Sequence, residues 1–219
     1  MKGRHENTDG GIRRRNPYQP ALDKARLDLN RLDPYVAALR SGGEVVETPQ
    51  GRAVELPYWG QRLRLLWSTG EARLVSGQSV STTVQLLVMH YLITADGTPL
   101  ADRWLSFREL PDGRVYDAAF RRRACLPLAQ VFGDHLEAFL LAGQCLGGEK
   151  LAYGDAAFMF QVLPRVRVAT ILYGRDEEFS ADANVLFDAT VCHYLPLEDV
   201  AVLGGLVARE LVRARGVEP

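Results

Sequence analysis

The sequence has few of the features by which many protein classes are identified, beginning with cysteine. It contains 3 cysteines in 219 residues, Cys125, Cys145 and Cys192. Their wide and unrelated spacings form neither a disulfide framework nor a CxxC zinc motif, so we predict free thiols and no metal site. A reducing compartment is the simplest setting for such a chain, and we expect it to be cytoplasmic.

Long apolar runs are also missing. The run Val84–Ile93 is far shorter than the roughly 20 residues that span a bilayer as a helix. Met1–Tyr18 carries charges without the apolar core of a signal peptide. The formal net charge of −1 gives no general attraction to nucleic acids or anionic membranes. We therefore predict a soluble protein that binds neither.

Familiar catalytic motifs are absent as well. The sequence contains no GxSxG, HExxH, Walker A or GxGxxG pattern. This makes a familiar hydrolase, kinase or dehydrogenase a poor hypothesis and leaves an unfamiliar enzyme open.

What the chain does contain is typical of a globular domain. Hydrophobic residues make up 47% and charged residues 24%, which suffices for a sizeable core. Residues 1–20 are polar, include Arg13-Arg14-Arg15, and are predicted to be a disordered tail. Residues 21–219 are predicted to form one domain.

Hydrophobic periodicity predicts the elements of this domain. Helices are expected at Ala21–Arg40, with a break near Asp33, at Ser79–Ala95 and at Pro196–Arg215. A helix pair is expected at Leu126–Phe132 and Asp134–Leu146, and Asp134 is expected to cap the second helix of the pair. Strands are expected as a three- or four-stranded meander within Glu44–Val75, and at Trp104–Leu110, Ala156–Leu163 and Arg167–Tyr173. The predicted class is α+β, with antiparallel sheets packed against the central apolar helix Ser79–Ala95 and the C-terminal helix. Adjacent Gly204 and Gly205 in that last helix predict close packing against another element.

The stretch Asp176–Asp199 is the expected centre of function, because it places polar side chains within an apolar frame. If Val185–Tyr194 is extended, Asn184, Asp188, Cys192 and Tyr194 lie on one face, and Phe187, Val191 and His193 on the other. Adjacent Cys192 and His193 then cannot serve one centre. We expect this stretch to fold back onto the helix Ser79–Ala95 and leave a pocket between them.

Aromatic and basic residues are dense in the second half of the chain. Aromatic walls with arginines and a histidine suit a large flat ligand with acidic edges, such as a tetrapyrrole. The predicted ligand-binding residues are His90, Trp104, Phe107, Arg108, Tyr116, Phe120, Arg121, Asn184, Phe187, Asp188, His193 and Tyr194. The alternative is that the aromatics fill the core and that His90 is a hydrogen-bonded core histidine. Consecutive Arg121, Arg122 and Arg123 cannot share one helix face, so at most one or two of them serve a single site.

A series of short blocks follows in order along the chain: LLVMHYL at Leu86–Leu92, Gly97-Thr98-Pro99, WLSFREL at Trp104–Leu110, YDAAFRR at Tyr116–Arg122, GDAAF at Gly154–Phe158, DEEF at Asp176–Phe179, ANVLFD at Ala183–Asp188 and HYLPLED at His193–Asp199. Through these blocks the chain resembles the domain of unknown function 3786 family, a family of prokaryotic proteins frequent in anaerobes. Some relatives carry an iron–sulfur domain similar to that of corrinoid proteins. The resemblance therefore implies a link to anaerobic corrinoid metabolism, and an iron–sulfur or corrinoid protein as a partner.

Three functions remain open at this point. The first is a non-catalytic ligand-binding or accessory protein, with a corrinoid or other tetrapyrrole as the ligand. The second is an enzyme that uses His90 or His193 as the acid–base group and Asp188 to orient it. The third is a structural subunit that holds a partner through its apolar β-ribbon or its glycine-bearing C-terminal helix.

Overall fold

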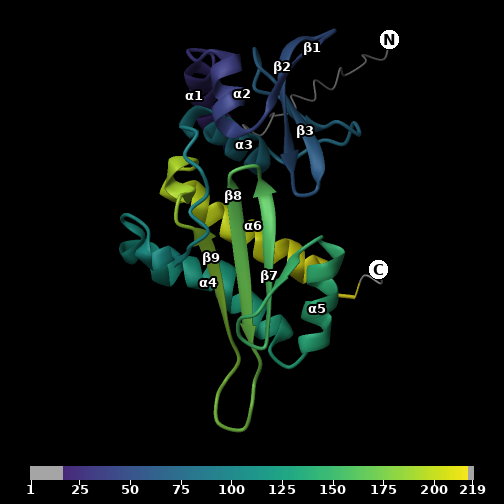
Figure 1. The fold of residues 1–219 in the computed structure, drawn as a ribbon, viewed down its shortest axis with the longest axis vertical. Coiled ribbons are helices and arrows are strands. Elements are labelled where there is room, and N and C mark those ends of the chain that lie inside the picture. The colour runs from purple at the N-terminus through teal and green to yellow at the C-terminus, as the bar shows by residue number, and fades with distance from the viewer. Residues whose placement is uncertain (1–16, 217–219) are drawn as a thin grey trace, which may run out of the picture.

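The computed structural model describes residues 17–216. The first part contains α1 (Gln19–Leu29), α2 (Pro34–Ser41), β1 (Glu44–Thr48), β2 (Gly51–Tyr58), β3 (Gln61–Leu66), β4 (Ala72–Leu74) and α3 (Thr82–Thr94). The second contains β5 (Trp104–Ser106), the 3₁₀ turn η1 (Phe107–Glu109), α4 (Gly113–Phe132), α5 (Leu136–Cys145), β6 (Glu149–Leu151), β7 (Ala156–Leu163), β8 (Val166–Tyr173), β9 (Asp182–Asp188), η2 (Val191–His193) and α6 (Leu197–Ala214). Figure 1 shows the first part above the second.

The N-terminal region begins with two short helices. Of the predicted tail, residues 1–20, the first 16 lie outside the described residues. Its last two residues, Gln19 and Pro20, already belong to α1. The predicted break near Asp33 is confirmed, since its carboxylate accepts hydrogen bonds from Tyr35 N at 2.8 Å and Val36 N at 3.2 Å. Pro34 occupies the first position of α2, where no N–H is needed.

The first sheet is the predicted meander. Its order is β1-β2-β3-β4, and Leu56 faces Leu63 across an antiparallel pair. Glu55 is the charged residue buried in it, and Arg64 satisfies its carboxylate with Nη2 at 2.6 Å from Oε1. A buried carboxylate is costly without such a partner, so this ion pair allows Glu55 to be buried in the sheet.

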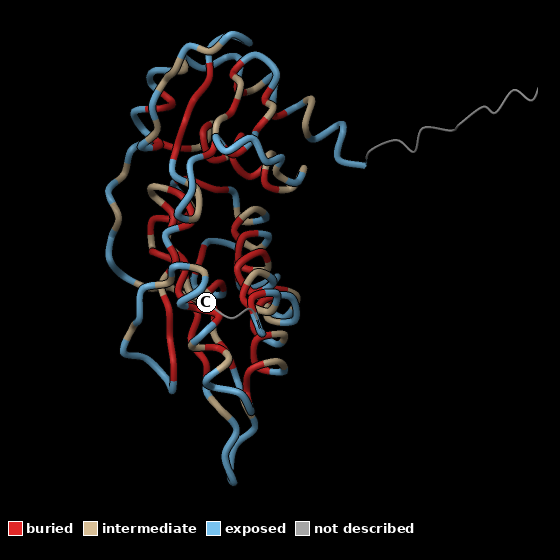
Figure 2. Tube along the Cα trace, turned by 90° about the vertical axis from the view of Figure 1, so that its right-hand side faces the viewer, coloured by how far each residue is buried: buried red, intermediate tan, exposed pale blue. Residues whose placement is uncertain are grey.

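The second sheet has the order β5-β9-β8-β7-β6 with antiparallel neighbours throughout. Helices α4 and α6 lie behind β7, β8 and β9 in the view of Figure 1, while α5 packs at β7. The loop between β8 and β9 extends as a long hairpin beyond the helices. In Figure 2 the buried residues gather between this sheet and its helices.

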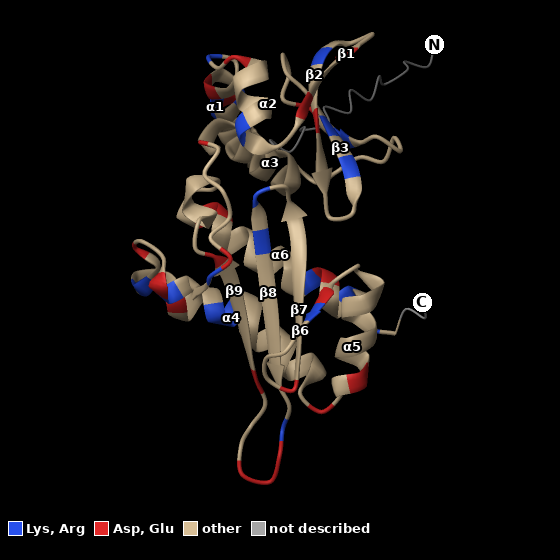
Figure 3. Cartoon of the chain, viewed as in Figure 1, with Lys and Arg blue, Asp and Glu red and all other residues tan. Residues whose placement is uncertain are grey.

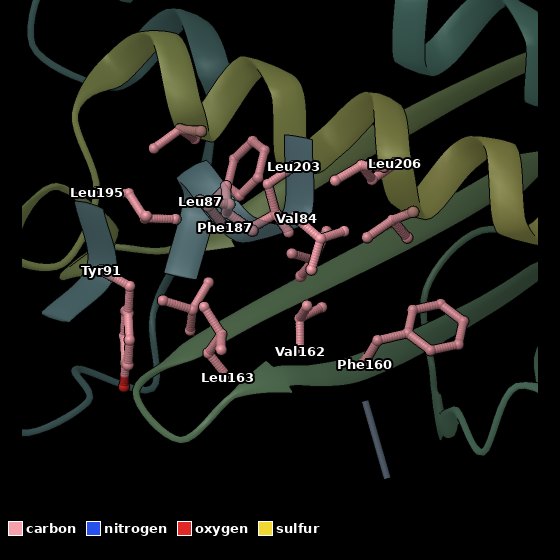
Figure 4. Close-up of a cluster of buried hydrophobic side chains, with 14 of the residues drawn as sticks. Val84, Leu87, Tyr91, Phe160, Val162, Leu163, Phe187, Leu195, Leu203 and Leu206 are labelled. Atoms are coloured by element: carbon pink, nitrogen blue, oxygen red, sulfur yellow. The ribbon is translucent and has the colours of Figure 1, made fainter. Parts of the chain in front are cut away.

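Helix α3 joins the two parts of the molecule. Figure 4 shows Val84, Leu87 and Tyr91 of α3 directed toward β7 and α6, whose Leu163 and Leu203 complete the cluster. All five side chains are buried and belong to one continuous core. The predicted α+β class is confirmed, with antiparallel sheets packed against this central apolar helix and the C-terminal helix.

Helix α4 differs from the helix predicted at Leu126–Phe132, because it is one helix of 20 residues that begins at Gly113. It continues through Pro127, which has no N–H to donate to the carbonyl of Arg123. Buried Phe120, Ala124, Leu128 and Phe132 recur at spacings of four, so one face packs without interruption. At about 1.5–3 kcal/mol for each large apolar side chain, this burial outweighs the roughly 3 kcal/mol cost of an internal proline.

Two further predictions were wrong in detail. The strand expected at Trp104–Leu110 ends at Ser106, where the capping box of Ser106 and Glu109 starts η1. Asp134 does not cap α5; its carboxylate pairs with Arg175 Nε at 2.9 Å.

The segment Val185–Tyr194 is extended only as far as Asp188 and then turns through η2. The predicted alternation therefore holds for Asn184 and Asp188, which share one face of β9, and fails beyond them. Within residues 17–216, no helix combines the length and apolar character needed to cross a bilayer.

Candidate functional site

The late segment does fold back onto α3, as expected from the sequence. The Tyr194 hydroxyl donates a hydrogen bond to the carbonyl of Thr98, and its ring lies 5.7 Å from that of Tyr91. Both tyrosines, together with Phe187 and Leu195, have no exposed surface. Solid packing fills the place where a pocket was expected between α3 and this segment, and that expectation is corrected here.

The predicted aromatic wall is part of the core. Phe107 and Phe120 stack with centroids 4.4 Å apart, and Phe120 contacts Phe187 at 5.8 Å. All three are buried, whereas Trp104 is half-buried and Tyr116 is exposed on α4. The three phenylalanine rings contact each other and leave no common surface for a flat ligand.

The predicted polar residues of β9 are likewise engaged within the protein. Arg121 donates to Asn184 Oδ1 at 3.1 Å and to Asp182 Oδ1 at 2.9 Å, which ties α4 to β9. Arg108 is exposed within η1. Arg121 therefore holds two elements together.

Asp188 is buried, with 2% of its surface exposed. Its Oδ1 accepts from Ala101 N at 3.1 Å, Thr190 N at 3.0 Å and Thr190 Oγ1 at 2.7 Å. Burial alone raises the pKa of this carboxyl, but these hydrogen bonds outweigh it and lower the pKa. Asp188 thus fixes the turn after β9 and orients neither histidine.

The two histidines of interest each pair with another aspartate. His90 Nδ1 lies 2.6 Å from Asp199 Oδ2, which joins α3 to the first turn of α6, and its side chain is 32% exposed. His193 Nδ1 lies 2.7 Å from Asp96 Oδ2 on the surface. The hydrogen bond from His193, helped by those from Thr98, holds the pKa of Asp96 far below its usual range. Within residues 17–216, no three His, Cys, Asp or Glu residues are arranged to bind a metal.

A groove that sequence reasoning missed runs along the outer side of α4 and α6. It has a volume of about 570 Å³, and Thr83 of α3 lines one end of it. Its apolar surface includes Tyr18, Pro127 of α4 and, on α6, Ala201, Val202, Gly205 and Val212. A Cβ added to Gly205 would meet no atom within 4 Å, so the space above this turn of α6 is open.

Arginines surround this apolar surface. Arg123 of α4 and Arg209 of α6 are exposed in the groove, and within residues 17–216 neither forms an ion pair. Arg213 is also in the groove and pairs with Glu210 at 2.9 Å. The groove therefore presents positive charge on both helices beside an apolar floor, an arrangement suited to an anion with an apolar body.

The sequence did carry a signal for this groove. Ala201, Gly205, Arg209 and Arg213 recur at spacings of four, and so lie along one stripe of α6. This stripe of small and basic residues lies opposite the buried face of α6.

A second hollow, of about 310 Å³, lies where Tyr58 and Trp59 meet Cys145 and Glu210. Burial, with a further contribution from Glu210, raises the pKa of Tyr58 to about 12, so this hydroxyl is neutral at physiological pH. The hollow offers an acidic and a neutral polar group, in contrast to the basic groove on the other side of α6.

A family model described as a domain of unknown function (DUF3786) matches residues 33–210. The chain belongs to the DUF3786 family. No curated protein and no solved structure matches it.

The DUF3786 match covers most of the site. It begins at Asp33, the cap of α2, and ends within α6, so it includes both sheets. Arg123, Gly205 and Arg209 lie inside the matched range, whereas Val212 and Arg213 lie just beyond it. The groove is thus formed chiefly by the DUF3786 domain itself.

Proposed function

We propose that this DUF3786 protein is a non-catalytic binding protein, and that the groove between α4 and α6 holds an anionic, partly apolar group of another molecule. The observation that carries the proposal is that Arg123 and Arg209, which form no ion pair within residues 17–216, lie beside the open surface at Gly205. Arginine is the side chain best suited to form bidentate hydrogen bonds with a carboxylate or phosphate.

Gly205 supports this proposal on energetic grounds. Glycine inside a helix costs about 1 kcal/mol relative to alanine. At Gly204 this cost has a structural reason, since a Cβ there would lie 2.6 Å from Phe120 Cε2. At Gly205 no atom within residues 17–216 supplies such a reason, and a group that approaches the helix backbone from outside would supply one.

A tetrapyrrole is the specific ligand to test first. Its carboxylates suit the arginines, and its apolar ring suits the floor formed by Val202 and Val212. Resemblance to relatives with corrinoid-type iron–sulfur domains favours the same class. The groove chemistry favours haem, which has two propionates, over a cobalamin whose side chains are amides.

Binding of 1-anilinonaphthalene-8-sulfonate, an aromatic anion whose fluorescence rises in apolar surroundings, tests the groove directly. We expect saturable binding that is weakened roughly tenfold, about 1.4 kcal/mol, in Arg123→Glu/Arg209→Glu and in Gly205→Trp. Arg122→Glu, an exposed neighbour outside the groove, is the matched control and should bind as the wild type does. Unchanged binding in both groove variants would overturn the proposal.

Haem and hydroxocobalamin, titrated into the same variants, test the ligand class separately. Haem absorbance that shifts on binding and fails to shift in Arg123→Glu/Arg209→Glu supports a tetrapyrrole carboxylate as the ligand. Binding of the naphthalene sulfonate without any binding of haem would remove the tetrapyrrole and leave the anion-binding groove.

A further inference from the structure

The hairpin between β8 and β9 is a second unexplained feature. It extends beyond the helices in both Figure 1 and Figure 2, and Figure 3 shows that its tip is acidic. The tip contains Asp176, Glu177, Glu178 and Phe179, and the phenylalanine is 68% exposed. Exposed aromatic side chains are enriched among the residues that anchor protein interfaces.

The tip has a defined backbone. Asp176 Oδ1 accepts from Glu178 N at 2.8 Å and Phe179 N at 2.6 Å, and Asp176 N donates to Phe179 O at 3.1 Å. These bonds use the Asp176 carboxylate and hold the ring of Phe179 outward. Within residues 17–216, Glu177 and Glu178 form no ion pair, so both carboxylates are available to a partner.

We propose that the groove between α4 and α6 receives this hairpin tip from a second copy of the chain. The proposal rests on the proposed function and names the anionic, partly apolar group as Glu177, Glu178 and Phe179. The phenylalanine ring packs on the open turn at Gly205, and the two glutamates pair with the arginines on either side of it. The same molecule therefore carries both halves of a complementary pair.

Charge distinguishes the second copy from the other occupant that the chain itself offers. Residues 1–16 precede Tyr18, which lines the groove, but their sequence has five Lys and Arg residues against two Asp and Glu residues, and Arg13-Arg14-Arg15 lies only three positions before Tyr18 in the sequence. Positive charge next to Arg123 and Arg209 is repulsive. The hairpin of the same molecule points away from its own helices in Figures 1 and 2, so the occupant is the tip of another copy.

The geometry determines the kind of assembly. Tip and groove are different surfaces, so the contact is head-to-tail, and each molecule can give one tip and receive another. One loop against one groove buries less area than the roughly 1,200 Å² of a stable complex. We therefore expect weak association, with a Kd on the order of 10–100 µM.

Sedimentation velocity of the full chain over a concentration series tests this inference. The wild type should associate as its concentration rises. Glu177→Lys/Glu178→Lys and Arg123→Glu/Arg209→Glu should each weaken association at least tenfold, and Phe179→Ser should do so without a change of charge. Glu137→Lys/Glu149→Lys, which reverses exposed carboxylates outside the tip, is the charge-matched control.

An equimolar mixture of the tip-reversed and groove-reversed chains is the decisive measurement. Each alone should stay monomeric, while the mixture should associate because every tip then meets a groove of opposite charge. A wild type that is monomeric up to about 500 µM, well above the expected Kd, or a mixture that stays monomeric, would overturn the inference. Naphthalene sulfonate binding to the tip-reversed chain, whose groove is intact, reports on the proposed function independently.

Discussion

Asp188 shows how a polar side chain in an apolar frame can serve structure alone. All three of its hydrogen bonds from Ala101 and Thr190 end on the same oxygen, Oδ1. The side chain thereby connects the end of β9 to the segment before β5 and fixes the approach to η2. Its partners are within the protein, so no ligand is needed to account for it.

Replacement of Asp188 should therefore affect stability in a graded way. We expect Asp188→Ala to lower the free energy of unfolding by about 2–3 kcal/mol, because buried donors of Ala101 and Thr190 lose their acceptor. Asp188→Asn keeps an oxygen at the Oδ1 position and should lose less. Urea denaturation of the two variants measures the difference, and equal losses would contradict the role assigned to Oδ1.

Asp96 and His193 form the clearest electrostatic pair on the surface. The hydrogen bond from His193 Nδ1 is the main cause of the lowered pKa of Asp96. Since the folded-state pKa lies below the ordinary value of about 3.9, the charged carboxylate favours the folded protein above that pH. This contribution is lost as the pH falls through the folded-state pKa.

Removal of the histidine should restore an ordinary aspartate. We expect His193→Ala to raise the pKa of Asp96 toward about 3.9, measured by carbon-detected NMR titration of the carboxyl group. The stability difference between wild type and variant should then shrink as the pH falls below about 4. A pKa that does not move would show that Thr98 alone holds the carboxylate in its charged form.

Helix α6 has two faces with opposite requirements at adjacent glycines. Gly204 faces inward, where an added Cβ would lie 2.6 Å from Phe120 and 3.2 Å from Phe187. Gly205 faces the open groove. The close packing predicted from this glycine pair is therefore found at Gly204 and not at Gly205.

One substitution should have opposite effects at these two positions. Gly205→Ala should stabilise the protein by about 1 kcal/mol through helix propensity. Gly204→Ala should destabilise it by about 1–3 kcal/mol, because the neighbouring rings must move. Guanidinium denaturation of both variants provides the comparison. A loss of stability at Gly205 would mean that something within the protein already covers that turn.

Contacts between the two sheets make the molecule one folded body. Trp59 N donates to Val162 O at 3.0 Å, and its ring lies 5.6 Å from Phe160. The Tyr91 hydroxyl donates to Ser41 O at 2.6 Å and accepts from Arg165 N at 3.1 Å. Apolar side chains form one continuous cluster through α3, so neither sheet has a separate core.

We therefore expect a single cooperative unfolding transition. Trp67 reports on the first sheet and Trp104 on the second, so chains with one of them as the sole tryptophan should give the same midpoint. Tyr91→Phe should lower the free energy of unfolding by about 2 kcal/mol, because two buried backbone groups lose their hydrogen-bond partner. Both midpoints should therefore fall together. Two separate midpoints would show that the sheets unfold independently.

Local pattern in the sequence was enough to predict most elements. The break at Asp33, the continuous apolar run of α3, the apolar stripe of α6 and the short apolar runs of β2, β7 and β8 depend on residues close together in the chain. Propensity, capping and burial of one face act over such distances. The prediction failed at Pro127 and after Asp188, where contacts with distant residues outweighed local preference.

The site depended on distances that the sequence does not contain. Several residues expected to bind a ligand instead contact other residues of the protein. His90 pairs with Asp199, and Phe120 contacts both Phe107 and Phe187. Buried polar groups in proteins are generally satisfied by such internal partners. The stripe of Gly205, Arg209 and Arg213 is visible in the sequence, yet only the packing of α4 against α6 brings Arg123 beside it and forms a groove. Helical periodicity fixes which residues share a face, whereas the partner of that face is chosen by the fit of whole elements in the core.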